Sequence, residues 1–199
     1  MSLDQLIRAV QEALGVDTDG KPGPETWQAI YNRICPDAGP PKPLPAKVDD
    51  RSERVIATLL PEVQSYARAL ITKAGSNGIT IKVISGLRTY DEQNELYAQG
   101  RTKPGSIVTN ARGGYSNHNF GVAFDVGVFE GSKYIDDSPK YKAVGLLGMD
   151  LGLEWGGNWK TIQDEPHFQL RPRWASDLTE KDMLAELRSR KDSGTSAYA

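Results

Sequence analysis

The fold is decided by residues 116–128, which read SNHNFGVAFDVGV. In the second half of this stretch, bulky apolar side chains alternate with Ala123, Asp125 and Gly127. Successive side chains of a strand point to opposite faces, so the alternation predicts a half-buried strand with one apolar face. Asp125 would then project from the other face, which the sequence keeps small around it.

A second short strand is predicted at residues 167–170, where His167 and Gln169 share one face and two apolar residues occupy the other. If the two strands are neighbours with their apolar faces in the core, Asp125 and His167 lie on the same side of the sheet. We expect His118 to reach them from the loop that leads into the first strand.

The chain contains only two histidines, His118 and His167. A catalytic zinc ion usually takes three protein ligands from His, Asp, Glu or Cys and keeps its fourth position open. These two residues and Asp125 would meet that count. Either histidine could instead be an ordinary hydrogen-bonded residue, so the residues by themselves leave both interpretations open.

Composition describes a soluble globular protein of 199 residues with 38% hydrophobic residues and a net charge of −2. This charge gives no indication of nucleic-acid binding, and no apolar run approaches the ~18 residues that span a bilayer. The N-terminus, residues 1–7, lacks the basic start and apolar core of a signal peptide. We therefore expect synthesis in the cytoplasm and no membrane insertion. Cys35 is the only cysteine and excludes an intramolecular disulfide.

Changes in composition predict four segments. Residues 1–35 form a small helical module, residues 36–48 a proline-rich linker, residues 49–175 the main domain, and residues 176–199 a polar helix with a disordered tail. Helical patterns and short strands are segregated within the main domain. This arrangement predicts an α+β domain with a small antiparallel sheet, preceded by the helical module.

Three ordered motifs in the main domain resemble a family of zinc peptidases. They are SGLRT at residues 85–89 with Gln93 and Leu96, SxHxxGxAxD at residues 116–125, and DxxH at residues 164–167. The family includes VanY-like D-Ala-D-Ala carboxypeptidases and L-alanyl-D-glutamate endopeptidases. The resemblance implies the small α+β fold that these peptidases share with the Hedgehog signalling domain.

The same resemblance implies that His118, Asp125 and His167 bind Zn²⁺ and that Asp164 is the catalytic base. Local geometry alone would favour Glu165, which shares a face with His167 in an uninterrupted strand. Because Pro166 does not show whether the chain bends before it, Glu165 stays an alternative.

The resemblance also implies roles in and around the substrate groove. Arg88 would lie beside the zinc and either stabilise the developing oxyanion or hold a substrate carboxylate. Ser116 would contact the substrate or orient His118. The WGGNW segment at residues 155–159 looks like the version in L-alanyl-D-glutamate endopeptidases, where it walls the groove, although Trp155 and Trp159 could equally be core residues.

The N-terminal module resembles the helical peptidoglycan-binding repeat of cell-wall hydrolases but is shorter than the full repeat. Together these features predict a monomeric, phage-endolysin-like enzyme that acts on the cell wall after release and hydrolyses the L-Ala-D-Glu bond of peptidoglycan stem peptides. The alternatives are a D-alanyl-D-alanine carboxypeptidase, a cytoplasmic peptidase that recycles wall peptides, and a non-enzymatic zinc-containing binding domain.

Overall fold

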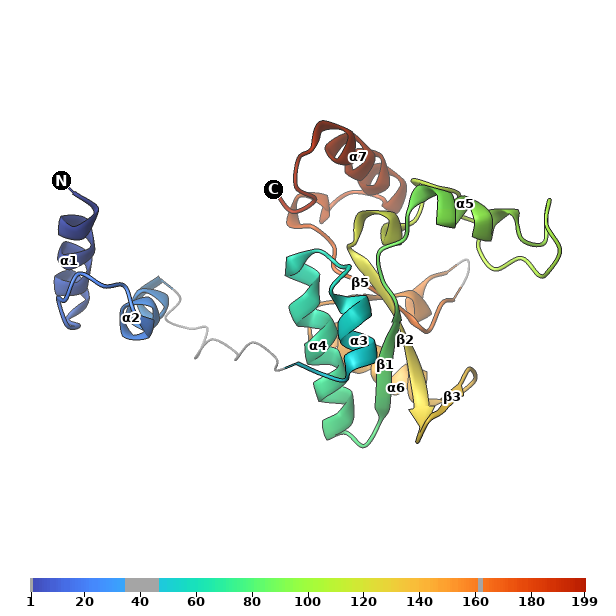
Figure 1. Cartoon of the computed structure of the whole chain (residues 1–199), viewed down its shortest axis with the longest axis horizontal. Coiled ribbons are helices and arrows are strands. Elements are labelled where there is room, and N and C mark those ends of the chain that lie inside the picture. The colour runs from blue at the N-terminus through green and yellow to red at the C-terminus, as the bar shows by residue number, and fades with distance from the viewer. Residues whose placement is uncertain (1, 35–46, 161–162) are drawn as a thin grey trace. The chain divides into compact units, whose positions relative to one another are not determined.

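The structure, a computed structural model, describes residues 2–34, 47–160 and 163–199 (Figure 1). The chain divides into two units, Met1–Leu44 and Pro45–Ala199. Cys35 and most of the predicted linker at residues 36–48 lie outside the described residues. Among the described helices, none is both long enough and apolar enough to cross a membrane.

The first unit contains the helices α1 (Leu3–Leu14) and α2 (Pro24–Ile34), which the apolar spacing predicted. The two helices are tied together through Gln11, whose side chain is only 1% exposed. Its Nε2 donates to Asp19 Oδ1 at 2.9 Å and to Thr26 Oγ1 at 3.1 Å. Because a buried amide needs partners for its polar atoms, these bonds fix how the turn between the helices closes.

The second unit is built on an antiparallel sheet with the strand order β1-β2-β5-β4, and β3 pairs with β2 outside this path. The strands are β1 (Thr80–Ser85), β2 (Ala123–Glu130), β3 (Lys133–Ile135), β4 (Glu154–Trp155) and β5 (His167–Gln169). Each pairing between these five strands is antiparallel. The predicted α+β fold with a small antiparallel sheet is therefore confirmed.

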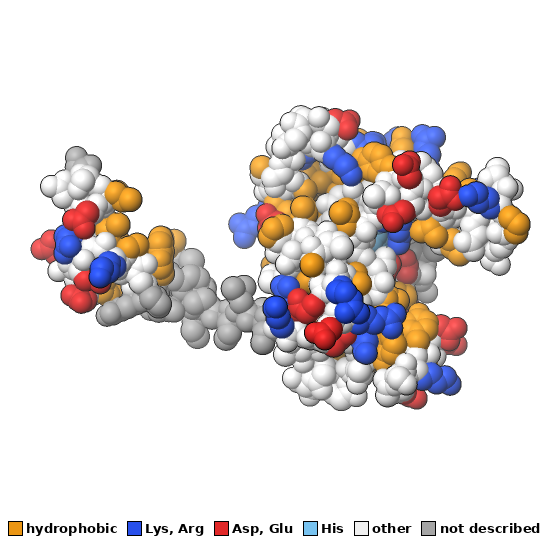
Figure 2. Space-filling model, in the orientation of Figure 1, with side chains coloured by type: hydrophobic (Ala, Val, Ile, Leu, Met, Phe, Trp, Pro, Cys, Tyr) orange, Lys and Arg blue, Asp and Glu red, His pale blue; other side chains and the backbone are white. Residues whose placement is uncertain are grey.

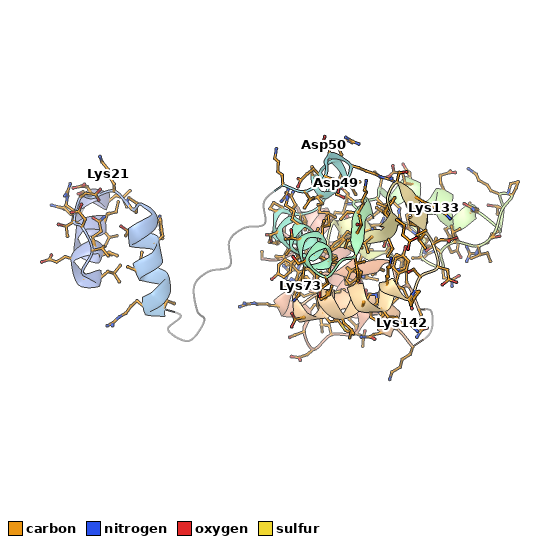
Figure 3. The ribbon with its side chains drawn as sticks, turned by 90° about the horizontal axis from the view of Figure 1, so that it is seen from below. Lys21, Asp49, Asp50, Lys73, Lys133 and Lys142 are labelled. Carbon is orange, nitrogen blue, oxygen red and sulfur yellow. The ribbon has the colours of Figure 1, made fainter. Side chains whose placement is uncertain are left out.

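Three helices, α3 (Asp50–Ile56), α4 (Pro61–Ser76) and α6 (Lys140–Asp150), share one core with the apolar face of the sheet. The fully buried members of this core include Ile56, Val63, Leu70, Val83, Phe124, Val126, Val128, Val144 and Phe168. Figure 3, a view from below, shows α4 and α6 with Lys73 and Lys142 labelled on them. An ion pair between Lys73 and Asp150 joins the two helices. The polar side chains of Asp125, His167 and Gln169 lie on the opposite face of the sheet.

Helix α6 contains two glycines, which on sequence grounds weaken a helix. A Cβ at Gly145 would lie 2.4 Å from the ring of Trp155, and a Cβ at Gly148 would lie 2.4 Å from the ring of Phe168. The missing side chains therefore let α6 pack directly on these two rings. The packing explains why glycine is tolerated inside this helix.

Helix α5 (Tyr90–Ala98) begins with a capping box between Thr89 and Glu92. The helix and the segment that follows it project from the body of the second unit (Figure 1). This projecting segment carries apolar side chains on its surface (Figure 2), of which Ile107 and Val108 are more than half exposed.

The C-terminal segment departs from the prediction. The polar helix is confirmed as α7 (Glu180–Ser193), and the tail after it is folded back. The Tyr198 hydroxyl donates to the Leu170 carbonyl at 2.8 Å, and Trp174 Nε1 donates to the Ala197 carbonyl at 2.8 Å. The prediction of a disordered tail is wrong, because Tyr198 and the Ala197 carbonyl are both held by residues of the folded unit. The same burial raises the pKa of Tyr198.

Candidate metal centre

Asp125 and His167 are directly opposite each other on β2 and β5. The residues that flank Asp125 on its strand, Phe124 and Val126, are fully buried in the core. Alternation along the strand therefore turns the Asp125 carboxylate toward the opposite face, where His167 also lies. The strand arrangement expected from the sequence places these two side chains together.

His118 comes from a short 3-10 helix, η1 (Asn117–Phe120), rather than from an irregular loop. Gly121 ends this helix with φ +69, a conformation that L side chains rarely adopt. The buried Asn119 fastens the segment, since its Nδ2 donates to the Arg88 carbonyl at 2.9 Å and its Oδ1 accepts from Gly114 N at 2.9 Å. These contacts hold the His118 ring over the polar face of the sheet.

Three potential ligand atoms form a small triangle. His118 Nε2 lies 3.1 Å from Asp125 Oδ1 and 3.3 Å from His167 Nδ1, and His167 Nδ1 lies 3.2 Å from the same Asp125 oxygen. For a tetrahedral zinc ion with bonds of ~2.0–2.1 Å, neighbouring ligand atoms are separated by about 3.3 Å. The triangle has the size that zinc requires. Within the described residues, it is the one group of three or more such side chains that could hold a metal ion.

The second nitrogen of each ring is already bonded to an oxygen. His118 Nδ1 lies 2.8 Å from the Gly86 carbonyl, which can only accept, so this nitrogen carries the proton. His167 Nε2 lies 3.0 Å from Gln169 Oε1. The nitrogens within the triangle therefore present lone pairs to each other and to a carboxylate. Such an arrangement is repulsive unless a cation, either a proton or a metal ion, sits between them.

The electrostatics of the triangle agree with this need for positive charge. Burial by itself would raise the pKa of Asp125, but the charge and hydrogen bonds of His118 and His167 hold it below its usual range. Burial by itself would lower the pKa of His167, but its hydrogen bond with Asp125 and the charge of that carboxylate raise it. Asp125 is therefore ionised and supplies negative charge that a cation can bind.

Arg88 lies at the side of the triangle, on the segment between β1 and α5. Its Nη1 donates to Gln93 Oε1 at 2.8 Å and its Nη2 donates to Ser85 Oγ at 3.1 Å. Nη2 also lies 3.9 Å from Asp125 Oδ2. Gln93 is fully buried, so the guanidinium is held in one place.

Asp164 precedes β5 in a turn rather than in an extension of the strand. Asp164 N donates to the Gly156 carbonyl at 3.0 Å, and His167 N donates to the Asp164 carbonyl at 3.2 Å. The strand alternation that would favour Glu165 therefore does not reach these residues. Burial first, and then the charge of Asp125, raise the pKa of Asp164.

All eight residues singled out in the sequence line one groove of about 1120 Å³. They are Arg88, Ser116, His118, Asp125, Trp155, Trp159, Asp164 and His167. Glu165 is not part of this lining, although its carbonyl accepts from Trp155 Nε1 at 2.7 Å. Trp155 belongs to the core as well as to the wall, whereas the Trp159 ring lies 4.8 Å from the His167 ring.

A group of polar residues behind His167 was not predicted as part of the site. Gln169, Asn117 and Glu154 form it together with Arg171 and Glu180. Gln169 could have been found, because it shares a strand face with His167. Glu180 could not, because it stands on α7 and no local pattern connects this helix to the sheet.

Comparison with known proteins agrees with this geometry. A family model described as D-alanyl-D-alanine carboxypeptidase matches residues 109–170. The chain is 38% identical over 130 residues to the peptidoglycan L-alanyl-D-glutamate endopeptidase CwlK of Bacillus subtilis, covering 59% of this chain and 77% of that protein. The chain therefore belongs to the peptidase family that includes CwlK. It is a metallopeptidase, and His118, Asp125 and His167 form the group that could hold its metal ion.

Two further relatives of this peptidase are more distant. An L-alanyl-D-glutamate peptidase of Listeria phage A118 is 30% identical over 123 residues, which cover 60% of this chain and 40% of the phage protein. The crystal structure of the L-Ala D-Glu endopeptidase ChiX from Serratia marcescens aligns with a TM-score of 0.49 and 26% identity, covering 63% of this chain and 90% of that one.

Proposed function

We propose that this enzyme hydrolyses an amide bond in the stem peptides of peptidoglycan, using zinc bound by His118, Asp125 and His167. The observation that carries the proposal is the triangle of three ligand atoms whose lone pairs face one another at 3.1–3.3 Å. The second nitrogen of each imidazole is occupied, as in many zinc sites. The groove leaves one side of the triangle accessible to a substrate.

Zinc, when bound there, would lower the pKa of a water molecule toward ~7 and polarise the scissile carbonyl. The side chains of the groove supply the remaining chemistry. Asp164 takes a proton from the attacking water and passes it to the leaving amine nitrogen, a role typically worth ~10²–10⁴-fold in rate. Arg88, held by Ser85 and Gln93, donates to the oxyanion as charge develops. Trp155 and Trp159 wall the groove, and Ser116 contacts the substrate.

We infer that the bond cut is the one between L-Ala and D-Glu. The support is the 38% identity to a peptidoglycan L-alanyl-D-glutamate endopeptidase, in an alignment that covers most of that protein. The terminal D-Ala-D-Ala bond is the alternative, because the matching family model is described by that activity. Both bonds need the same zinc chemistry and differ in how the groove holds the peptide.

Mass spectrometry of purified muropeptides after digestion with the zinc-loaded enzyme separates these functions. Cleavage at L-Ala-D-Glu gives one fragment that ends in L-Ala and one that begins with D-Glu. Loss of a single D-Ala would support the carboxypeptidase instead. Intact muropeptides in the presence of zinc would contradict both and would favour a zinc-containing binding domain.

We also propose that the first unit, Met1–Leu44, binds peptidoglycan and brings the catalytic groove to the cell wall. Its helices carry apolar side chains on their surface, among them Trp27, which is 60% exposed, and Ile34, which is 71% exposed. Aromatic rings in such positions can pack against sugar rings.

Deletion of residues 1–38 should weaken co-sedimentation with purified wall sacculi, and Trp27→Ala in the full chain should weaken it in part. Unchanged sedimentation of the deletion variant would refute the anchoring role.

A further inference from the structure

Behind the metal triangle, Gln169 holds the outer nitrogen of His167. The Gln169 side chain is 1% exposed. Its Oε1 lies 3.0 Å from His167 Nε2 and accepts from Asn117 Nδ2 at 2.6 Å. Its Nε2 donates to Glu154 Oε2 at 2.6 Å and lies 3.5 Å from Glu180 Oε2. Both ends of this amide are therefore engaged.

The two carboxylates fix which way the amide faces. If the amide were turned over, its oxygen would point at Glu154 and Glu180, which can only accept when ionised. Its NH₂ group would then point at the NH₂ group of Asn117. Because the turned arrangement places like groups together at both ends, Gln169 must present its oxygen to His167. The orientation follows from charge rather than from an arbitrary assignment.

Arg171 keeps the two carboxylates in place. Its Nε contacts Glu154 Oε1, and its Nη2 donates to Glu180 Oε2 at 2.8 Å. Burial by itself would lower the pKa of Arg171, but its contacts with these carboxylates raise it. Glu180 is the first residue of α7, so the C-terminal helix takes part in holding Gln169.

The orientation of Gln169 decides the state of the His167 ring. An oxygen at 3.0 Å from His167 Nε2 requires a proton on that nitrogen. His167 Nδ1 is then left with its lone pair, which faces Asp125 and His118. We propose that Gln169 is a positioning residue, which fixes the tautomer and the direction of His167 through an amide held by the carboxylates of Glu154 and Glu180. This inference depends on the zinc site of the proposed function.

Zinc affinity tests the proposal more directly than activity does. In Gln169→Leu the acceptor is lost and the shape is largely kept, so the dissociation constant for zinc should rise about 10–100-fold, as is typical when a partner of a metal-binding histidine is removed. Competition with a chromophoric zinc chelator at pH 8 measures this constant. Melting of the same proteins in EDTA reports any damage to the fold that is independent of the metal.

Gln11→Leu is the matched control, because Gln11 is equally buried and fully hydrogen-bonded but lies in the first unit. It should leave zinc affinity unchanged. If the wild-type protein itself binds no zinc, the proposed function fails. If the wild-type protein binds zinc and Gln169→Leu binds it equally well, only the positioning role of Gln169 is refuted.

A charge exchange keeps the proposal testable if Gln169→Leu does not fold. Gln169→Glu places a third carboxylate against Glu154 and Glu180 and should weaken zinc binding at least about fivefold at pH 8. Adding Glu154→Gln to the Gln169→Glu variant restores an amide–carboxylate pair, with the carboxylate now at position 169 and the amide at position 154. The double variant should recover to within about threefold of the wild-type affinity, because neighbouring substitutions of this kind are not additive. A double variant that binds zinc no better than Gln169→Glu would overturn the proposal.

Discussion

Gly156 offers a test of how precisely the groove holds Asp164, the proposed catalytic base. It lies in η2 (Gly156–Asn158), next to the turn that carries Asp164. A Cβ built on Gly156 would lie 2.5 Å from the Asp164 carbonyl oxygen, 3.0 Å from His167 Cβ and 3.2 Å from Asp164 Cβ. The φ angle of Gly156 is one that alanine can adopt, so the effect of Gly156→Ala is purely one of contact.

The size of the effect follows from these distances. Ordinary contact begins at 3.4 Å, so the backbones at Gly156 and Asp164 must separate by 3.4 − 2.5 = 0.9 Å. A misplacement of about 1 Å near a reacting centre can cost ~10²-fold in rate. We expect Gly156→Ala to lower kcat about 100-fold on muropeptides. Overpacking should also destabilise the fold by about 1–3 kcal/mol.

The assay combines kcat on muropeptides with thermal melting, and Gly75→Ala is its control. Gly75 lies in α4, where a Cβ would meet nothing within 4 Å. The control should therefore keep full activity and gain about 0.5–1 kcal/mol in stability. A folded Gly156→Ala variant with kcat within about threefold of wild type would refute the reasoning, because it would show that the base tolerates the shift.

Three further predictions concern the base, the metal and an ion pair of the second unit. Asp164→Asn should lower kcat on muropeptides by ~10²–10⁴-fold while zinc binding persists. Glu165→Gln should keep a kcat near that of wild type. Equal losses of kcat in the two variants would contradict the choice of Asp164 as the base. At a free zinc concentration of ~100 Kd, binding should stabilise the wild-type fold by ~2.7 kcal/mol. Chelation of the zinc should therefore lower the melting temperature by about 5–10 °C. An unchanged melting temperature in calorimetry would contradict a bound metal. The contacts of Arg68 lower the pKa of Glu53 from 4.5 to about 2. Since the folded pKa is the lower one, the pair stabilises the fold above pH 4.5 and loses this effect as the pH falls toward 2. Glu53→Gln should therefore cost about 1–3 kcal/mol at pH 7 and little at pH 2.5 in urea titrations; a loss independent of pH would contradict the ion pair.

Much of the metal triangle follows from short-range patterns. Alternation in residues 122–128 shows which way Asp125 points, and the same rule applied to residues 167–170 places His167 on the matching face. These predictions hold because the direction of a side chain on a strand is a local property of the backbone. The apolar sides of both strands are also strong enough to fix their register in the core.

Local patterns could not predict the polar contacts that hold the site residues in place. The turn at Asp164 depends on a hydrogen bond to Gly156, and the orientation of Gln169 depends on Glu154 and Glu180. Glu180 stands on a helix that the sequence marks only as polar. Contacts between segments far apart in the chain leave no periodic signal in either segment, so they could not be predicted.

The order of the C-terminal tail could not be predicted from local patterns either. Its composition is polar, and composition alone predicts disorder. The Tyr198 ring nevertheless packs, partly buried, against the core, and Trp174 Nε1 donates to the carbonyl of the neighbouring Ala197. The sequence by itself predicted the class of fold and the group His118, Asp125 and His167 proposed to bind zinc, because both depend on local alternation and on motifs. Only the tertiary structure decided what holds the ligands in place, because burial and charge act between residues that meet only after the chain has folded.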